Sequence, residues 1–148
     1  MVAQVQLFKG DSFTDHRGCL RFVNEFSFPG VKRFYSIIHP DSSVVRAWQG
    51  HQVEHKYFYV AQGSFALAWV AIDNWDTPSP YLKAEYVVLK ATEPAVLSVP
   101  KGFANGIKAM EDNSILLVYS DLTLQESSAD RWSFDQQLWL NWQELNDK

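Results

Sequence analysis

The sequence predicts an all-β fold, built as a sandwich or barrel of short strands. Apolar, β-rich runs alternate with turn residues at close spacing along most of the chain, which is typical of such folds. Aromatic residues, which favour strands and bury large areas, make up 15% of the 148 residues. No stretch before residue 122 has the period of an amphipathic helix.

Each expected strand is an apolar run that ends at a turn signal. The expected strands are residues 19–26, 33–38, 44–48, 56–61, 64–72, 84–89, 95–99 and 114–120. The turn signals include Pro29-Gly30, Pro40-Asp41, Gln62-Gly63, Asp73-Asn74 and Pro100-Lys101-Gly102. Residues 122–131 are expected to hold a helical turn, and residues 139–145 are compatible with a strand or a short helix.

Length, charge and cysteine content exclude several classes of protein. The length fits one domain over residues 1–148. A formal charge of −4 argues against nucleic acid as the main partner, because phosphate binding needs a basic surface. The longest apolar run, residues 65–72, is far shorter than the ~20 residues that cross a bilayer. Cys19 is alone and the N-terminus lacks a signal-peptide pattern, so a reducing cytoplasm is the expected compartment.

The densest group of polar side chains lies beside strong strand sequence. It contains Arg46, Gln49, His51, Glu54, His55 and Lys56. Residues two apart on a strand share a face, so Gln49 and His51 are expected to face one interior together. A turn within residues 52–54 would change the alternation, and the sequence leaves open whether His55 or Lys56 points inward.

This polar group has three interpretations. His51 and His55 with a nearby carboxylate or amide would make a metal site, although amides are weak ligands and no cysteine is in reach. An imidazole that titrates near neutrality would act as a general base on a proton made acidic by a neighbouring carbonyl. The third interpretation is structural, a solvated polar cluster beside a turn.

Two further groups are candidates for a site. Residues 99–106 place Asn105 in a segment with two glycines and a proline, which is typical of a rigid turn that leads into a strand. Arg33 and Tyr35 lie two apart on one expected strand, and Tyr119 lies on another. Arginine has a forked set of donors suited to phosphate, and tyrosine can donate a proton or hydrogen-bond an oxyanion.

Several segments resemble two related enzyme families. Residues 13–20 (FTDHRGCL), 32–35 (KRFY) and 46–51 (RAWQGH) are similar to dTDP-4-oxo-6-deoxyglucose 3,4-ketoisomerases. Residues 99–106 (VPKGFANG) and 132–142 (WSFDQQLWLNW) are similar to dTDP-4-dehydrorhamnose 3,5-epimerases. Both families have the cupin jelly-roll fold. The resemblance, which spans residues 13–142, therefore implies a single cupin-type double-stranded β-helix.

The resemblance assigns several positions. In the ketoisomerase segment Arg-Gly-x-His-x-His, Arg46 matches the arginine and His51 the second histidine, whereas Gln49 replaces the first. Glutamine does not act as a base near pH 7. The resemblance leaves open whether the chain is a 3,5-epimerase or a 3,4-ketoisomerase.

The epimerase resemblance covers the later positions. Lys56 lies seven residues before Gly63, as a lysine does in that family. Asn105 replaces a histidine in the proline-glycine turn. Tyr119 matches one family tyrosine, and Gln125 replaces a second, the proposed acid. Metal-binding cupins use histidine at positions 49 and 105, so the resemblance implies no metal and no cofactor.

The implied reaction starts with removal of a proton beside a 4-keto group, which gives an enolate. His51 is the expected base, with Tyr119 or Tyr35 as proton donor. Lys56 or Arg46 would hold the oxyanion. The expected ligands of the diphosphate are Arg33 and Arg17, and Trp48, Tyr57 or Tyr59 would stack on thymine. Arg46, Gln49 and Asn105 are further expected substrate-binding residues. His55, also expected at the substrate, is a reserve base.

The implied partner is a nucleotide sugar, dTDP-linked, on a route to deoxysugars of cell-surface polysaccharide. The implied assembly is a homodimer, since a small β-rich domain can cover an edge by pairing with a second copy. Two other functions stay open. Amides at positions 49, 105 and 125 favour a cupin that binds a sugar or nucleotide sugar without turnover. A metal-dependent cupin enzyme with another chemistry is the other alternative.

Overall fold

The computed structural model describes residues 4–145, and strands dominate it. The strands are β1 (Gln6–Lys9), β2 (Asp11–Asp15), β3 (Gly18–Phe22), β4 (Arg33–His39), β5 (Val45–His51), β6 (Lys56–Gln62), β7 (Ser64–Ala71), β8 (Glu85–Lys90), β9 (Ala95–Val99), β10 (Phe103–Ala109), β11 (Ser114–Ser120) and β12 (Trp132–Ser133). One short helix, α1 (Leu124–Ser128), and one 3₁₀ turn, η1 (Trp142–Glu144), follow β11. Neither helix in this part of the chain is long and apolar enough to cross a membrane.

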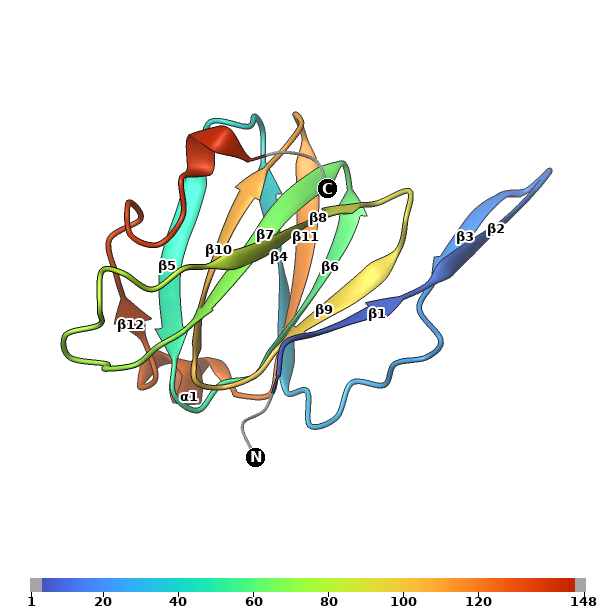
Figure 1. Cartoon of the computed structure of the whole chain (residues 1–148). Coiled ribbons are helices and arrows are strands. Elements are labelled where there is room, and N and C mark those ends of the chain that lie inside the picture. The colour runs from blue at the N-terminus through green and yellow to red at the C-terminus, as the bar shows by residue number, and fades with distance from the viewer. Residues whose placement is uncertain (1–3, 146–148) are drawn as a thin grey trace.

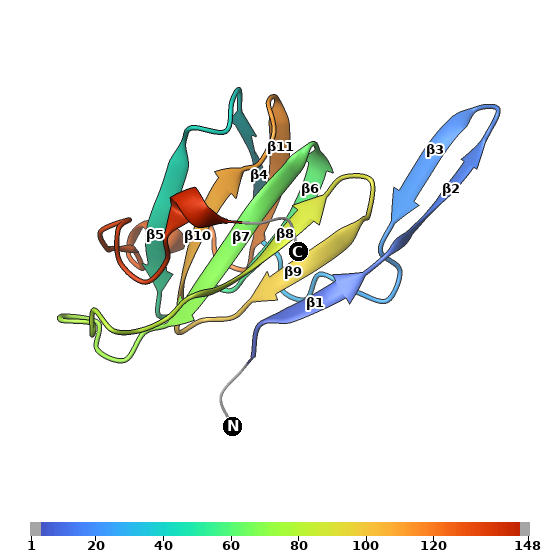
Figure 2. The ribbon, with the colours of Figure 1, turned by 45° about the horizontal axis from the view of Figure 1, so that its top comes forward.

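Two five-stranded antiparallel sheets face each other. One has the order β1-β9-β6-β11-β4, and the other has the order β12-β5-β10-β7-β8. Strands β2 and β3 form a separate hairpin, which stands off from the body (Figures 1 and 2). This is the all-β, jelly-roll architecture that the strand spacing and the family resemblance predict.

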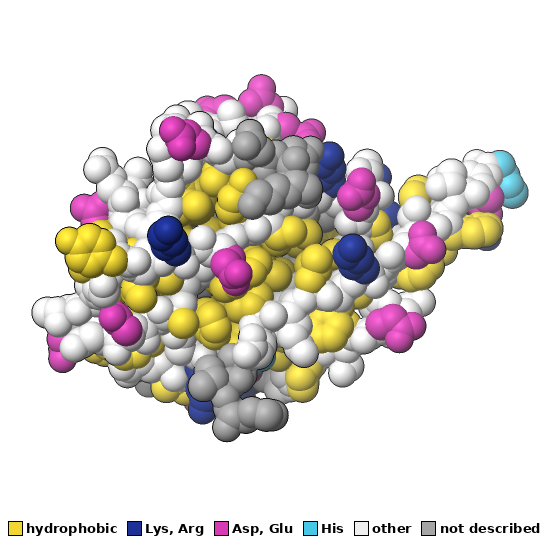
Figure 3. Space-filling view, in the orientation of Figure 1, with side chains coloured by type: hydrophobic (Ala, Val, Ile, Leu, Met, Phe, Trp, Pro, Cys, Tyr) yellow, Lys and Arg dark blue, Asp and Glu magenta, His cyan; other side chains and the backbone are white. Residues whose placement is uncertain are grey.

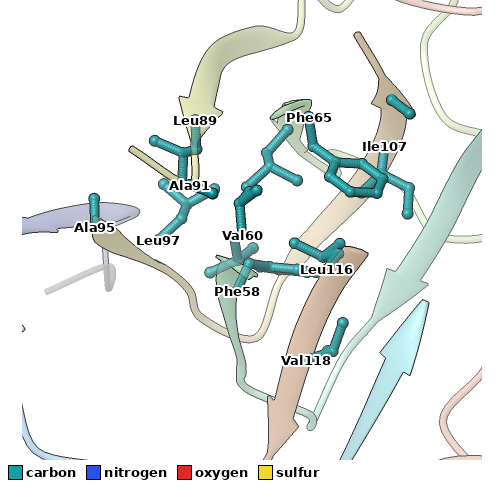
Figure 4. Packing of buried hydrophobic residues seen from close by; sticks show 13 residues of the cluster. Phe58, Val60, Phe65, Leu89, Ala91, Ala95, Leu97, Ile107, Leu116 and Val118 are labelled. Carbon is teal, nitrogen blue, oxygen red and sulfur yellow. The ribbon is translucent and has the colours of Figure 1, made fainter. Parts of the chain in front are cut away.

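The main core lies between the two sheets. Phe58 of β6 and Leu116 of β11 contribute from one sheet, and Phe65 of β7 and Ile107 of β10 contribute from the other (Figure 4). All four are at most 4% exposed. Side chains alternate between the faces of a strand, so the residues between these positions point away from this core.

A second apolar layer covers the outer face of the β5-β10-β7 sheet. Trp48, Ala68 and Ala104 pack there against Trp139 and Trp142 of the C-terminal segment. The C-terminal segment therefore closes the face that the sheet turns away from the first core. Apolar layers on both faces of the sheet explain why five consecutive residues of β7, from Ser64 to Ala68, are buried.

Most of the expected strands are present, with small differences at their ends. The predictions at residues 95–99 and 114–120 match β9 and β11 end for end. The predicted run 19–26 is too long, because β3 ends at Phe22. The sequence pattern missed β1 and β2, which are short strands with mainly exposed residues, and the two-residue β12. The turn expected over residues 99–106 is also too long, because β10 begins at Phe103 and Asn105 lies on that strand. The predicted helical turn is α1, which begins at a capping box between Thr123 and Glu126.

Candidate active site

A cavity of about 670 Å³ opens between the two sheets where β4 and β5 face each other. Residues of β4, β5, β6, β10 and β11 line it, together with the segment that contains α1. The structure brings seven of the predicted site residues together in this cavity: Arg33, Tyr35, Arg46, Gln49, His51, Lys56 and Asn105.

The alternation of β4 and β5 presents these groups. Arg33 and Tyr35 lie two apart on β4 and line the cavity together. Gln49 and His51 do the same on β5. Arg46 lies three residues before Gln49, yet it also lines the cavity, because the pairing of β5 with β10 shifts register there. Such an irregularity places one extra residue in a strand and reverses its alternation.

His51 is held by groups behind its ring. Its Nδ1 lies 2.9 Å from the main-chain oxygen of Asp130 and 3.2 Å from Oε1 of Glu54. Both neighbours are acceptors, so Nδ1 carries the proton and donates it, and Nε2 keeps a lone pair. Nε2 is buried and has no partner among the described residues. The His51 ring lines the cavity. It therefore presents an unprotonated Nε2 to the cavity, and the acceptors at Nδ1 fix this tautomer.

Burial lowers the pKa of His51, and the nearby Lys56 ammonium lowers it further. The Asp130 carbonyl and the carboxylates of Glu54 and Asp130 oppose this without reversing it. The imidazole is therefore neutral at pH 7, which is the protonation state that a general base requires. Protonation would occur only below the ordinary histidine pKa of 6.5.

Glu54 is a fully buried carboxylate that several donors support. It accepts hydrogen bonds from the hydroxyls of Ser120 and Ser127, the latter at 2.8 Å, and lies 3.4 Å from Nη2 of Arg33. Burial alone would raise the pKa of Glu54, but the Lys56 ammonium and the two hydroxyls lower it overall. An ionised Glu54 therefore backs the imidazole and would stabilise its protonated form during a reaction.

Asp130 fixes the turn that follows β5. Its carboxylate accepts the backbone N–H groups of Gln52 at 2.8 Å, Val53 at 3.0 Å and Glu54 at 2.8 Å. The carboxylate thus supplies acceptors that the turn itself lacks. This turn places Glu54 beside His51 and breaks the alternation before β6.

Replacing Asp130 by alanine is expected to lower the free energy of unfolding by about 2–4 kcal/mol, because two part-buried donors and one buried donor lose their acceptor. Denaturant unfolding measures this loss. Asp135→Ala is the matched control, because Asp135 accepts one backbone N–H in an exposed turn, and its cost should stay below about 1 kcal/mol. Equal losses in the two variants would contradict this role for Asp130.

His51, Glu54 and Asp130 also have the residue types of a metal site. Their candidate ligand atoms lie within 4.8 Å of one another. The carboxylate oxygens, however, already accept hydrogen bonds from three backbone N–H groups and two hydroxyls. A cation would have to displace these donors, so the arrangement fits the support of an imidazole better than metal coordination.

Positive side chains surround the imidazole. Lys56 is 8% exposed and lines the cavity beside His51. Arg33 lies over the ring of Tyr35, with 4.9 Å between its guanidinium carbon and the ring centroid. Arg46 and Arg131 line the cavity as well and are largely exposed. A chain with net charge −4 thus concentrates cations at one cavity, which favours an anionic ligand.

Two aromatic residues predicted for the site do not line this cavity. Tyr119 points to the outer face of β11, because Leu116 and Val118 occupy the inner face, and it packs against Phe28 and Phe34. Trp48 has no exposed surface. Its indole N–H donates to the carbonyl of Leu138 in the C-terminal segment. The ring therefore has no open face on which thymine could stack.

Four other predicted residues also lie outside the cavity. His55 stacks on Tyr57 with a centroid distance of 4.5 Å and contacts the Ser98 hydroxyl at 2.7 Å. Tyr57 and Tyr59 point away from the inner face of β6, and alternation leaves Lys56 on that inner face. Lys56 rather than His55 therefore lines the cavity. Arg17 pairs with Asp15 at 2.6 Å on the β2-β3 hairpin and does not line the cavity.

Sequence reasoning missed the residues that α1 and the segment after it contribute. Ser127 and Arg131 line the cavity, and Asp130 supports His51. They lie more than 70 residues from β5, and no local pattern links the two segments. The capping box at Thr123 is a readable signal for the helix, but it does not show that the helix packs beneath β5.

The full sequence, residues 1–148, matches the family described as dTDP-4-dehydrorhamnose 3,5-epimerase. A comparison with curated proteins gives no match. Among solved structures, the chain is similar to the RmlC epimerase from Mycobacterium tuberculosis, with a TM-score of 0.75 and 17% identity over 97% of this chain and 76% of that one.

Two ketoisomerases are also similar. The TDP-quinovose 3,4-ketoisomerase WlaRB from Campylobacter jejuni has a TM-score of 0.69 and 18% identity, over 90% of this chain and 95% of its own. The sugar 3,4-ketoisomerase QdtA from Thermoanaerobacterium thermosaccharolyticum, in complex with TDP, has a TM-score of 0.66 and 19% identity, over 86% and 87%. These likenesses confirm the jelly-roll fold, and the match over the full length shows that the chain belongs to the dTDP-4-dehydrorhamnose 3,5-epimerase family.

Proposed function

We propose that the protein is an isomerase or epimerase that acts on a nucleotide-linked 4-keto-6-deoxyhexose. The reaction is a proton transfer with an enolate intermediate. The observation that carries the proposal is His51, whose Nδ1 is held by Asp130 and Glu54 while its buried Nε2 has no partner. Family membership supports the substrate class. The cavity's own residues support a mechanism that needs no metal.

The reaction would start at the carbon beside the 4-keto group. Nε2 of His51 takes the proton from that carbon, and the electron pair moves onto the ketone oxygen to give an enolate. The ionised Glu54, 3.2 Å from Nδ1, stabilises the imidazolium that forms. Asp130 keeps the ring in place through its carbonyl.

The cavity also provides the other two groups that enolate chemistry needs. The Lys56 ammonium is positioned to stabilise the developing oxyanion, and preorganised charge of this kind is usually the largest catalytic contribution. Tyr35 takes the role of proton donor in place of Tyr119, because only Tyr35 lines the cavity. Gln49 and Asn105 pair across β5 and β10 and offer amide groups to sugar hydroxyls.

The diphosphate would bind to the exposed arginines of the cavity, Arg46 and Arg131. We expect Arg131→Ala to weaken TDP binding about tenfold, which corresponds to the loss of one charge-assisted hydrogen bond. Isothermal titration calorimetry with TDP measures this change. Lys83→Ala removes an exposed cation outside the cavity and serves as the control. An unchanged Kd in Arg131→Ala would contradict the assignment.

The proposed activity is tested by identifying the product. The protein is incubated with dTDP-4-oxo-6-deoxyglucose and followed by proton NMR. A carbonyl at C3 identifies a ketoisomerase, and inversion at C3 or C5 identifies an epimerase. TDP binding without any product would favour the second candidate, a cupin that only binds the nucleotide sugar. Three amides at positions where the family resemblance implies catalytic groups favour that candidate.

We further propose that the protein is a homodimer that acts in the cytoplasm. Phe13 and Leu20 pair across the β2-β3 hairpin and are 54% and 65% exposed. Figure 3 shows hydrophobic side chains on this hairpin and across the middle of the body. A second copy would cover them. Light scattering should give twice the chain mass for the wild type, and Phe13→Ser with Leu20→Ser should give a monomer. A monomeric wild type would contradict the proposal.

A further inference from the structure

A buried histidine lies at the far end of the strand that carries Arg33 and Tyr35. His39 is the last residue of β4, is 2% exposed, and packs against Phe65 with a ring-centroid distance of 5.4 Å. It does not line the cavity, so it does not touch a ligand there. The proposed reaction leaves it without a role.

Within residues 4–145, the His39 side chain makes one hydrogen bond, and its partner is a cavity residue. Nε of Arg46 donates to Nε2 of His39 at 3.1 Å. Nε2 must therefore be unprotonated, so the proton of the neutral ring is on Nδ1, which is buried and has no partner among the described residues. Burial, and then the charge of Arg46, lowers the pKa of His39, while Asp41 opposes the shift. The ring is thus a neutral acceptor with a fixed tautomer.

The contact also constrains the guanidinium. A guanidinium is planar, so a hydrogen bond at Nε restricts the plane of the whole group. The two terminal nitrogens stay available to a ligand, and Arg46 lines the cavity. An exposed arginine without such a contact would have to be ordered by the ligand at an entropic cost.

We propose that His39 is a positioning residue that holds the Arg46 guanidinium in the orientation that binds the phosphate groups of the substrate. The inference rests on the proposed function, because it takes the ligand to be a nucleoside diphosphate. The proposal adds His39, which orients Arg46, to a site in which Arg46 would touch the anion.

Two substitutions of His39 separate positioning from packing. His39→Gln keeps an acceptor, the side-chain oxygen, whereas His39→Phe fills the ring volume without one. We expect His39→Phe to raise the Kd for TDP, and the KM, about five- to tenfold with kcat changed less than twofold, and His39→Gln to stay within about twofold in Kd. If the two variants weaken binding equally, or if His39→Phe leaves Kd unchanged, the proposal is overturned.

A second background tests whether the effect passes through Arg46. Arg46→Lys keeps a positive charge but has no Nε. In that background His39→Phe should cause no additional loss of TDP affinity, because the contact is already absent. A further loss equal to that in the wild type would show that His39 acts through packing and would overturn the proposal.

A spectroscopic readout keeps this test distinct from that of the proposed function. Nitrogen-15 NMR of the ligand-free protein should show His39 with Nδ1 protonated and Nε2 unprotonated, and TDP binding should leave that tautomer unchanged. The opposite tautomer would overturn the contact regardless of any activity. If TDP and inorganic diphosphate both fail to bind, the positioning role fails. Binding with no turnover contradicts only the proposed isomerase activity.

Discussion

His51→Asn is expected to lower kcat about 10³–10⁴-fold while the protein stays folded. The variant keeps a polar side chain at the position but removes the nitrogen that accepts the proton, and positioned acid–base groups contribute rate factors of this order. The rate is measured on dTDP-4-oxo-6-deoxyglucose by NMR, and circular dichroism checks the fold.

His55→Asn is the matched control for the His51 variant. His55 is a histidine four positions away that faces Tyr57 and Ser98 rather than the cavity. Its activity should stay within about threefold of the wild type, a range set by the absence of any contact with the reacting atoms. Loss of activity in His55→Asn comparable to that in His51→Asn would mean that the base has been assigned to the wrong histidine.

Lys56→Met is the second variant with a large expected effect. Removing the cation beside the developing oxyanion should lower kcat about 10²–10³-fold, as loss of a preorganised stabilising group does elsewhere. It should also change the pH dependence. Lys56 is the second cause, after burial, of the lowered pKa of His51. Without it the pKa of His51 rises, so the acid limb of the pH–rate profile moves to higher pH.

Two measurements separate the effects of Lys56. The pH–rate profile of the residual activity reports the acid limb, and NMR titration of the His51 ring reports its pKa directly. Lys101→Met, an exposed lysine outside the cavity, should leave both unchanged. An acid limb that stays in place, or moves to lower pH, in Lys56→Met would contradict the electrostatic coupling between Lys56 and His51.

Strand spacing and the family resemblance predicted the fold, and alternation predicted four of the residues that line the cavity. Arg33 with Tyr35, and Gln49 with His51, are pairs two apart on strands, and the structure places both pairs in the cavity. Prediction from alternation fails where both faces of a strand are apolar. In β11, Leu116 and Val118 face inward while Ile115 and Leu117 face outward. The pattern therefore gave no sign that Tyr119 points out.

Irregular geometry and long-range contacts account for the rest. The register shift between β5 and β10 turns Arg46 into the cavity although it lies three residues before Gln49, and no residue pattern reports such a shift. The turn at residues 52–54 decides between His55 and Lys56, and its geometry depends on Asp130, which lies 76 residues beyond Glu54. Contacts between segments far apart in the sequence could therefore not be predicted from local sequence patterns.

The most direct test of the central claim is proton exchange in D₂O. The wild type and His51→Asn are incubated with dTDP-4-oxo-6-deoxyglucose in D₂O, and NMR follows deuterium at C3 and C5. If His51 removes a proton to give an enolate, the wild type incorporates deuterium at one of these carbons and His51→Asn does not. Incorporation by His51→Asn at the wild-type rate, or none by a wild type that still binds TDP, would contradict the claim.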